Sequence, residues 1–167
     1  MKNALVTGGS GYLGSHLCKL LKSNGWNVSV LDLKFPRHNY IDNYYQIDIR
    51  DKEGLREVFY FHNFDVVFHF AGKIEVAEST LNPTEFYDVN TAGTCNLLNV
   101  MKSYGVNKIV YSSTAAVYQS KKRQLHEDDS VTFRNSPYAG SKLSAEYAIQ
   151  QSGFDYVIFR YFNSAVS

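Results

Sequence analysis

The sequence predicts a doubly wound α/β domain, in which helices cover both faces of a parallel β-sheet of six or more strands. Two observations predict this fold: short β-branched runs alternate with longer segments of helical periodicity, and the short runs are continuously apolar. Continuous apolar runs are typical of strands buried on both faces of a parallel sheet, and the alternation of strands with helices indicates right-handed crossovers. The chain of 167 residues is long enough for one such domain, expected to span residues 1–167.

Taken in order, the elements begin with a strand at 3–7 (NALVT), followed by a helix at 12–24 with a leucine stripe on one face. Further strands are expected at 27–32, 44–48, 65–70, 107–113 and 154–160, and further helices at 51–62, 84–104 and 138–151. Gly25, Gly105 and Gly153 each follow one of these segments, where a left-handed C-terminal cap is expected.

Composition excludes several classes of protein. The formal charge is +1, from 17 basic and 16 acidic residues, so neither nucleic acid nor an anionic membrane surface is expected as a partner. No apolar run approaches the roughly 18 residues of a membrane span. The two cysteines, Cys18 and Cys95, are expected to be free in a reducing compartment, and the five histidines lack metal-ligand spacing. We therefore expect a cytoplasmic protein without a metal site.

A glycine-rich turn follows the first strand directly. The segment TGGSGYLG contains Gly8, Gly11 and Gly14 between a predicted strand and a predicted helix. Glycines in this context allow a tight turn and let the backbone approach a pyrophosphate, while the helix N-terminus presents oriented N–H groups. Asp32 ends the second strand, near the spacing of a carboxylate that accepts hydrogen bonds from an adenosine ribose, which favours NAD over NADP. Lys34 lies close enough to weaken that preference.

Two other nucleotide or acyl chemistries are excluded by pattern. The chain has no Gly-x-x-x-x-Gly-Lys-Ser/Thr phosphate loop, and Ser10 lies in no Gly-x-Ser-x-Gly elbow. The segment SPYAGSK is more informative, because Tyr138 and Lys142 are four residues apart on a predicted helix and share one face. This pair indicates acid–base chemistry.

The motifs taken together resemble the extended short-chain dehydrogenase/reductases, and most closely the UDP-glucose 4-epimerase family. The resemblance covers essentially the whole chain, in the right order, through TGGSGYLGSH, the Asp32 strand end, DIRD (48–51), HFAG (69–72), YSSTAAVY (111–118), SPYAGSK and RYFN (160–163). It implies the Rossmann fold and NAD as cofactor. Members of the family usually continue into a C-terminal sugar-nucleotide domain, which we expect to be absent from this chain.

The resemblance also implies a role for each matching position. The residues expected to bind NAD are Gly8, Gly11, Tyr12, Leu13, Gly14, Asp32, Asp48, Ile49, Phe70, Ala71, Gly72, Asn90, Tyr138, Lys142 and Tyr161. The expected catalytic residues are Thr114, Tyr138 and Lys142, and the expected substrate contacts are Thr114, Tyr138 and Asn163. The implied reaction is epimerisation at C4 of a UDP-hexose through a transient 4-keto sugar, in a homodimer that associates through the helices near 84–104 and 138–151.

The chemistry explains why this reaction requires a tyrosine beside a lysine. Free tyrosine has a pKa near 10, and lowering it to about 7 corresponds to roughly 4 kcal/mol. An ammonium about 4 Å away, at an effective dielectric constant near 20, supplies an interaction of about that size. We therefore expect Lys142 to lower the pKa of Tyr138, with the Thr114 hydroxyl steadying the sugar oxygen.

Alternatives remain open at this point. Ala115 and Ala116 stand where a 4,6-dehydratase carries an Asp-Glu pair, which disfavours that reaction, whereas a 4-keto reductase uses the same three catalytic residues. A non-catalytic NAD-binding fragment is the alternative from a different class. One departure from the family concerns the pyrophosphate, because Lys73 follows Gly72 directly and Ile74 takes the place that the family often gives to lysine.

Overall fold

The fold is a single six-stranded parallel sheet flanked by helices. The computed structural model describes residues 1–119 and 122–162. The strands are β1 (Asn3–Thr7), β2 (Asn27–Leu31), β3 (Asn43–Tyr45), β4 (Val66–His69), β5 (Lys108–Thr114) and β6 (Asp155–Tyr161), in the spatial order β3-β2-β1-β4-β5-β6. Every pairing is parallel. The order runs outward in both directions from β1, so the predicted doubly wound sheet is confirmed.

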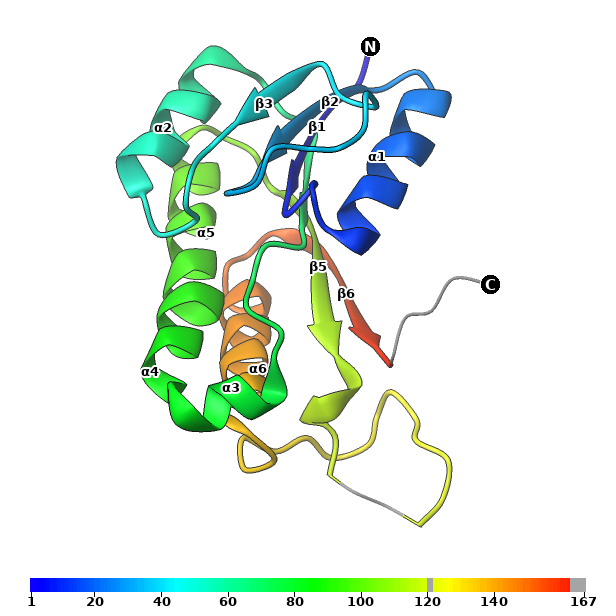
Figure 1. The fold of residues 1–167 in the computed structure, drawn as a ribbon, viewed down its shortest axis with the longest axis vertical. Helices are drawn as coiled ribbons and strands as arrows, with labels where there is room; N and C mark the ends of the chain where they lie inside the picture. The colour runs from blue at the N-terminus through cyan, green and yellow to red at the C-terminus, as the bar shows by residue number, and fades with distance from the viewer. Residues whose placement is uncertain (120–121, 163–167) are drawn as a thin grey trace.

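Helices lie on both faces of the sheet. The helical elements are α1 (Tyr12–Ser23), α2 (Lys52–Phe61), α3 (Val76–Leu81), α4 (Pro83–Phe86), the π-helix η1 (Tyr87–Ala92), α5 (Gly93–Ser103), the 3₁₀ turn η2 (Ala115–Val117) and α6 (Pro137–Gln150). Helix α1 covers one face near β1 and β2, whereas α2, α5 and α6 cover the other face (Figure 1). No helix in the described part of the chain has the length and apolar character needed to cross a membrane.

The apolar core divides along the sheet. The larger cluster packs α2, α5 and α6 against the sheet, around Leu5, Leu97 and Ile109. A second cluster, which includes Val6, Val30 and Cys18, lies beneath α1. Both faces of β1 and β2 are therefore buried, as the continuous apolar runs predict.

The predicted element boundaries were mostly right. The three glycines expected to end helices have positive φ angles, of 76° at Gly25, 72° at Gly105 and 78° at Gly153, which confirms the left-handed caps. The helix predicted at 84–104 is wrong as one element, because it is divided into α4, η1 and α5. Helix α3 and turn η2 were not predicted.

Candidate active site at the carboxyl ends of the strands

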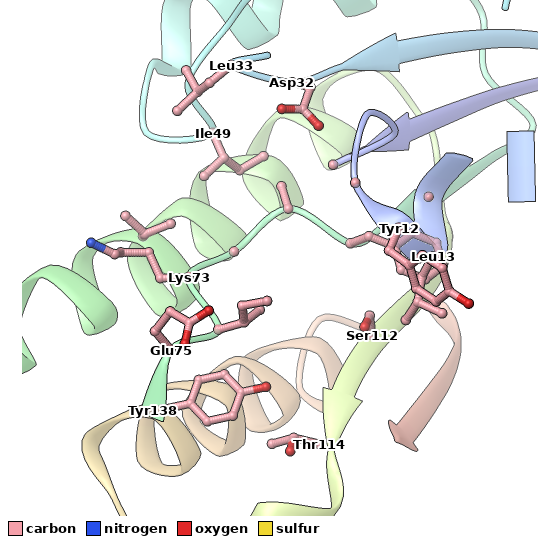
Figure 2. Close-up of a pocket in the computed structure, with 18 of the residues that line it drawn as sticks. Tyr12, Leu13, Asp32, Leu33, Ile49, Lys73, Glu75, Ser112, Thr114 and Tyr138 are labelled. Atoms are coloured by element: carbon pink, nitrogen blue, oxygen red, sulfur yellow. The ribbon is translucent and has the colours of Figure 1, made fainter. Parts of the chain in front are cut away.

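A cavity of about 1420 Å³ opens at the carboxyl ends of the strands. The predicted site residues that line it are Gly8, Gly11, Tyr12, Leu13, Gly14, Asp32, Asp48, Ile49, Phe70, Ala71, Gly72, Thr114, Tyr138 and Tyr161. Figure 2 shows Asp32 and Ile49 toward one end, Tyr12 and Leu13 along one side, and Tyr138 with Thr114 at the opposite end. Asn90 and Lys142 do not line the cavity, and Asn163 lies outside the described residues.

The glycine-rich turn brings backbone rather than side chains to the cavity. Gly8 has a φ of 71°, and a Cβ there would lie 2.6 Å from the backbone nitrogen of Ala71. A Cβ on Gly14 would lie 2.3 Å from the carbonyl oxygen of Gly8. The turn can therefore close only without these side chains.

The first turn of α1 is suited to hold an anion. Its N-cap is Gly11, which offers no side-chain cap, and the Ser15 N–H is the first to bond back to the Gly11 carbonyl, at 2.9 Å. The N–H groups of Tyr12, Leu13 and Gly14 precede that bond, so they have no intrahelical acceptor and stand at the cavity wall. Oriented N–H groups at the positive end of a helix fit a pyrophosphate, so the residues present fit NAD.

Asp32 is fixed by two backbone amides. One carboxylate oxygen accepts a hydrogen bond from the Ser10 N–H at 3.0 Å, and the other accepts one from the Lys34 N–H at 3.0 Å. Ser10 also donates its hydroxyl to the Lys34 carbonyl at 2.6 Å. These bonds join the glycine-rich turn to the segment after β2, and Ser10 was not singled out from the sequence.

Asp48 is held in a similar way by a side chain. Arg50 donates to both of its carboxylate oxygens, at 3.0 Å from Nε and 2.6 Å from Nη2, and also bonds Asp88 at 3.0 Å. The Arg50 guanidinium lowers the pKa of Asp48 below its ordinary value. Asp48 therefore lies at the cavity wall as a fixed carboxylate.

Tyr138 lies in the first turn of α6. Ser136 caps this helix by accepting the Ala139 N–H at 3.0 Å, and Pro137 occupies the first helical position, so local sequence sets where the helix begins. Burial raises the pKa of Tyr138, and the hydroxyl of Thr114 offsets this only in part. The Thr114 oxygen accepts the Ala116 N–H at 3.1 Å, which leaves its hydroxyl proton and one lone pair for other partners.

The expected effect of Lys142 on Tyr138 is wrong for the protein described here. Lys142 is only 3% exposed, and its ammonium lies 4.5 Å from the centroid of the Tyr111 ring. Burial lowers the pKa of Lys142 to about 8, while Glu146 raises it in part. The pKa of Tyr138 is raised rather than lowered, because loss of hydration is the larger effect on the phenolate.

A buried carboxylate connects the three elements that carry these residues. Glu146 is completely buried, accepts a hydrogen bond from the Ser113 hydroxyl, and is paired with Arg160 at 2.7 Å. Ser113 precedes Thr114 on β5, and Arg160 precedes Tyr161 on β6. Sequence reasoning missed Glu146, although a glutamate one helical turn after Lys142 in an apolar segment was a usable signal.

Lys73 forms ion pairs with glutamates of the two helices that follow it, α3 and α4. Its ammonium lies 2.8 Å from Glu78 and 2.9 Å from Glu85. Figure 2 shows the ammonium directed away from the middle of the cavity. Ile74, at the position that the family often gives to lysine, is 65% exposed. This edge of the cavity therefore offers a paired cation.

A glycine-rich turn after the first strand of a parallel sheet and a carboxylate at the end of the second strand are typical of a dinucleotide-binding domain. Comparison with known families identifies it further, because residues 4–165 match the model of the NAD dependent epimerase/dehydratase family. The chain belongs to this family. The match confirms the resemblance drawn from the sequence motifs.

Individual relatives are consistent with the family. A UDP-glucose 4-epimerase of Halalkalibacterium halodurans is 39% identical over 96% of this chain and 50% of its own length. A second UDP-glucose 4-epimerase, of Lacticaseibacillus casei, is also 39% identical, over 96% of this chain and 51% of its own. The crystal structure of the UDP-glucose 4-epimerase of Bifidobacterium longum in complex with NAD⁺ and UDP is 34% identical over 97% of this chain and 53% of that chain, with a TM-score of 0.90. The chain thus spans about half the length of the relatives that it matches.

Proposed function

We propose that this chain binds NAD in the cavity and is the nucleotide-binding part of an NAD-dependent enzyme that epimerises C4 of a nucleotide-diphosphate hexose of the UDP-glucose/UDP-galactose type. The observation that carries the proposal is the placement of Tyr138 and Thr114 on one wall of the cavity that the glycine turn and Asp32 also line. The relatives named above are UDP-glucose 4-epimerases, which supports the choice of substrate.

The cavity residues divide the task. The backbone N–H groups at the start of α1 hold the pyrophosphate, Asp32 holds the adenosine ribose, and Asp48 with Ile49 borders the adenine. When bound, oxidised NAD accepts and returns a hydride and adds a positive charge to the site. The sugar lies between Thr114 and Tyr138, where the Tyr138 oxygen exchanges the proton of the 4-hydroxyl.

Tyr138 requires positive charge to act as this base. Burial raises its pKa in the structure, so the phenol is protonated at neutral pH unless cations approach. A cation about 4 Å away supplies roughly 4 kcal/mol at an effective dielectric constant near 20, or about three pKa units, so a phenol whose pKa is raised above 10 needs further positive charge to ionise near neutral pH. Lys142 is buried behind the cavity wall, with its ammonium 3.7 Å from the place of a Cβ on Gly72, and its role in the proposal is to hold the nicotinamide ribose.

The residues that line the cavity bear on two alternative reactions, dehydration and 4-keto reduction. Ala115 and Ala116 line the wall beside Thr114, where a dehydratase requires acidic side chains, so elimination of water is disfavoured. Reduction of a 4-keto sugar requires only Thr114, Tyr138 and Lys142, and stays the alternative reaction. A non-catalytic NAD-binding protein is the alternative from a different class.

Assembly and location form part of the same proposal. A homodimer through the segments near 84–104 and 138–151 is supported by partly exposed Tyr87 and Tyr147, which lie on those segments. We place the protein in the cytoplasm, where free cysteines persist. Sedimentation of a monomer at high concentration would count against the dimer.

The experiment that tests the proposal measures NAD binding by calorimetry and then the conversion of UDP-galactose to UDP-glucose. Tyr138→Phe is expected to keep NAD affinity within about threefold and to lower turnover by about 10²-fold or more, because general acid–base catalysis contributes about 10²–10⁴-fold. Tyr60→Phe, at an exposed position of α2 that does not line the cavity, is the control and is expected to change neither. Binding without turnover in the wild-type chain would favour the non-catalytic alternative, and near wild-type turnover of Tyr138→Phe would exclude Tyr138 as the base.

A further inference from the structure

A buried histidine lies directly behind the wall of the cavity. His69 is 1% exposed and ends β4, immediately before the 70–72 turn whose residues line the cavity. In the sheet it is in register with Thr7 of β1 on one side and Tyr111 of β5 on the other. Its ring does not line the cavity, so contact with a ligand does not explain it.

The hydrogen bonds around His69 can be assigned a direction from the Thr94 end. At one end the Thr94 hydroxyl lies 2.6 Å from the Asn90 carbonyl, which can only accept, so Thr94 donates its single proton there. The His69 Nε2 is 2.9 Å from the same hydroxyl and must therefore donate to it. At the other end the Ala71 N–H donates to the Thr7 hydroxyl at 3.3 Å. Because Nε2 carries the ring proton of a neutral imidazole, Nδ1 is left as an acceptor, and Thr7 donates to it at 2.6 Å.

The hydrogen bonds around His69 extend to both ends of the 71–73 segment, which borders the cavity. Asn90 takes part in this series of hydrogen bonds through its backbone carbonyl, which accepts from Thr94. Its side-chain oxygen accepts the Lys73 N–H at 2.8 Å. Its side-chain nitrogen donates to the Lys73 carbonyl at 3.0 Å. The turn from Ala71 to Lys73 is therefore held at its first residue through Thr7 and at its last residue through Asn90. His69 is the link between these two ends.

We propose that His69 is a positioning residue that acts as the neutral Nε2–H tautomer and fixes the 71–73 segment as the floor of the cofactor cavity. The proposal rests on the proposed function in one respect, that this cavity receives NAD. A neutral ring is expected because His69 is buried and a charged ring would lie near the buried ammonium of Lys142. The titratable groups that face the ring are Tyr111 from β5 and Lys142 from α6. Burial and the charge of Lys142 lower the pKa of His69 to about 3.

The first test reads the tautomer in the wild-type chain without any ligand. Long-range ¹H–¹⁵N correlation spectra of the labelled histidine side chains distinguish Nε2–H, Nδ1–H and doubly protonated rings. His69 is expected to give the Nε2–H pattern unchanged from pH 5.5 to 8.5. An Nδ1–H pattern, or titration of His69 within this range, would overturn the proposal.

The second test removes one neighbour at a time. Thr7→Val takes away the donor to Nδ1 but leaves the acceptor of Nε2–H, so the Nε2–H pattern is expected to persist. Thr94→Val takes away that acceptor, so the pattern is expected to change to Nδ1–H or to a mixture. The reverse result in the two folded variants would contradict the assigned direction of the chain.

The third test connects His69 to the cofactor. His69→Leu is expected to weaken NAD binding about tenfold, since Thr7 and Thr94 lose a buried partner. His69→Gln, which can still donate to Thr94, is expected to recover part of that loss. If wild-type protein binds no NAD, the proposed function fails while the tautomer result stands. If wild-type protein binds NAD and folded His69→Leu binds it equally well, the positioning role is refuted.

Discussion

Strands β2 and β6 are both apolar in sequence, yet they differ in how the fold covers them. In β2, Val28 and Val30 are fully buried, because α1 packs on one side and the rest of the second core cluster surrounds them. In β6, Val157 is 48% exposed and Phe159 is 47% exposed, and the described residues cover this strand from the α6 side. An apolar run thus predicts a strand, but it does not predict how many of its faces are packed.

This difference matters for the site. The cofactor side of the cavity rests on β1 and β2, which are packed on both faces. The catalytic side rests on β5, α6 and β6, where a buried ion pair and hydrogen bonds replace part of the missing apolar packing. The following predictions test whether polar contacts stabilise the catalytic side as strongly as close packing stabilises the cofactor side.

The largest effect is expected from Glu146→Ala. Removing this carboxylate leaves Arg160 without its buried partner and Lys142 without a nearby negative charge, so the free energy of unfolding should fall by about 3–5 kcal/mol. Urea denaturation followed by circular dichroism measures it. The control is Glu53→Ala, which removes an exposed pair with Arg56 and should change stability by less than about 1 kcal/mol. A loss below about 1 kcal/mol for Glu146→Ala would mean that β6 does not depend on the ion pair.

Gly8→Ala tests the cofactor side in the same terms. Gly8 and Gly25 have nearly equal φ angles, of 71° and 76°, so the backbone strain of an alanine is about 1–2 kcal/mol at either position. Only at Gly8 would the Cβ meet backbone atoms, the nearest at 2.6 Å, whereas nothing lies within 4 Å at Gly25. Gly8→Ala should therefore lower the free energy of unfolding by about 3 kcal/mol, and Gly25→Ala by about 1. Equal losses would show that the turn can relax.

Between the two sides, His69 makes stability depend on pH. Its pKa is about 3 in the folded chain and 6.5 in the unfolded chain, so the unfolded chain binds more protons between these values. Stability from this group is therefore present above pH 6.5 and is lost as the pH falls toward 3. From pH 6.5 to 4.5 the loss should be about 2–3 kcal/mol, and a folded His69→Gln variant should lack that component. Parallel acid dependence of the two proteins would contradict the assignment.

The sequence predicts the cofactor side better than the catalytic side for a physical reason. The turn after β1 depends on glycines within seven consecutive residues, so short-range chemistry is sufficient there. Glu146 is paired with Arg160, 14 positions away, and accepts a hydrogen bond from Ser113, 33 positions away. Both contacts form only once β5 and β6 are in register. Such contacts carry no local signature.

The division of the helix predicted at 84–104 has a similar origin. Its apolar spacing continues through the segment, but Pro83 opens a separate helix α4 and a π-turn widens η1 before α5 begins. The π-turn includes Asn90, whose amide bonds Lys73 and Ser141. These partners come from other elements, and a change of one residue in helical pitch leaves no clear mark in the apolar pattern.

The smallest effect is expected at the exposed face of β6. Val157→Thr keeps the branched side chain and should change the free energy of unfolding by no more than about 0.5 kcal/mol, because the new hydroxyl stays hydrated. The matched variant Val30→Thr buries the same hydroxyl in the second core cluster and should cost about 1–3 kcal/mol. Urea denaturation at two protein concentrations checks both. If Val157→Thr lowers the free energy of unfolding as much as Val30→Thr does, and more at the higher protein concentration, then a second copy covers β6 in solution. The contrast between β2 and β6 would then hold only for the isolated chain.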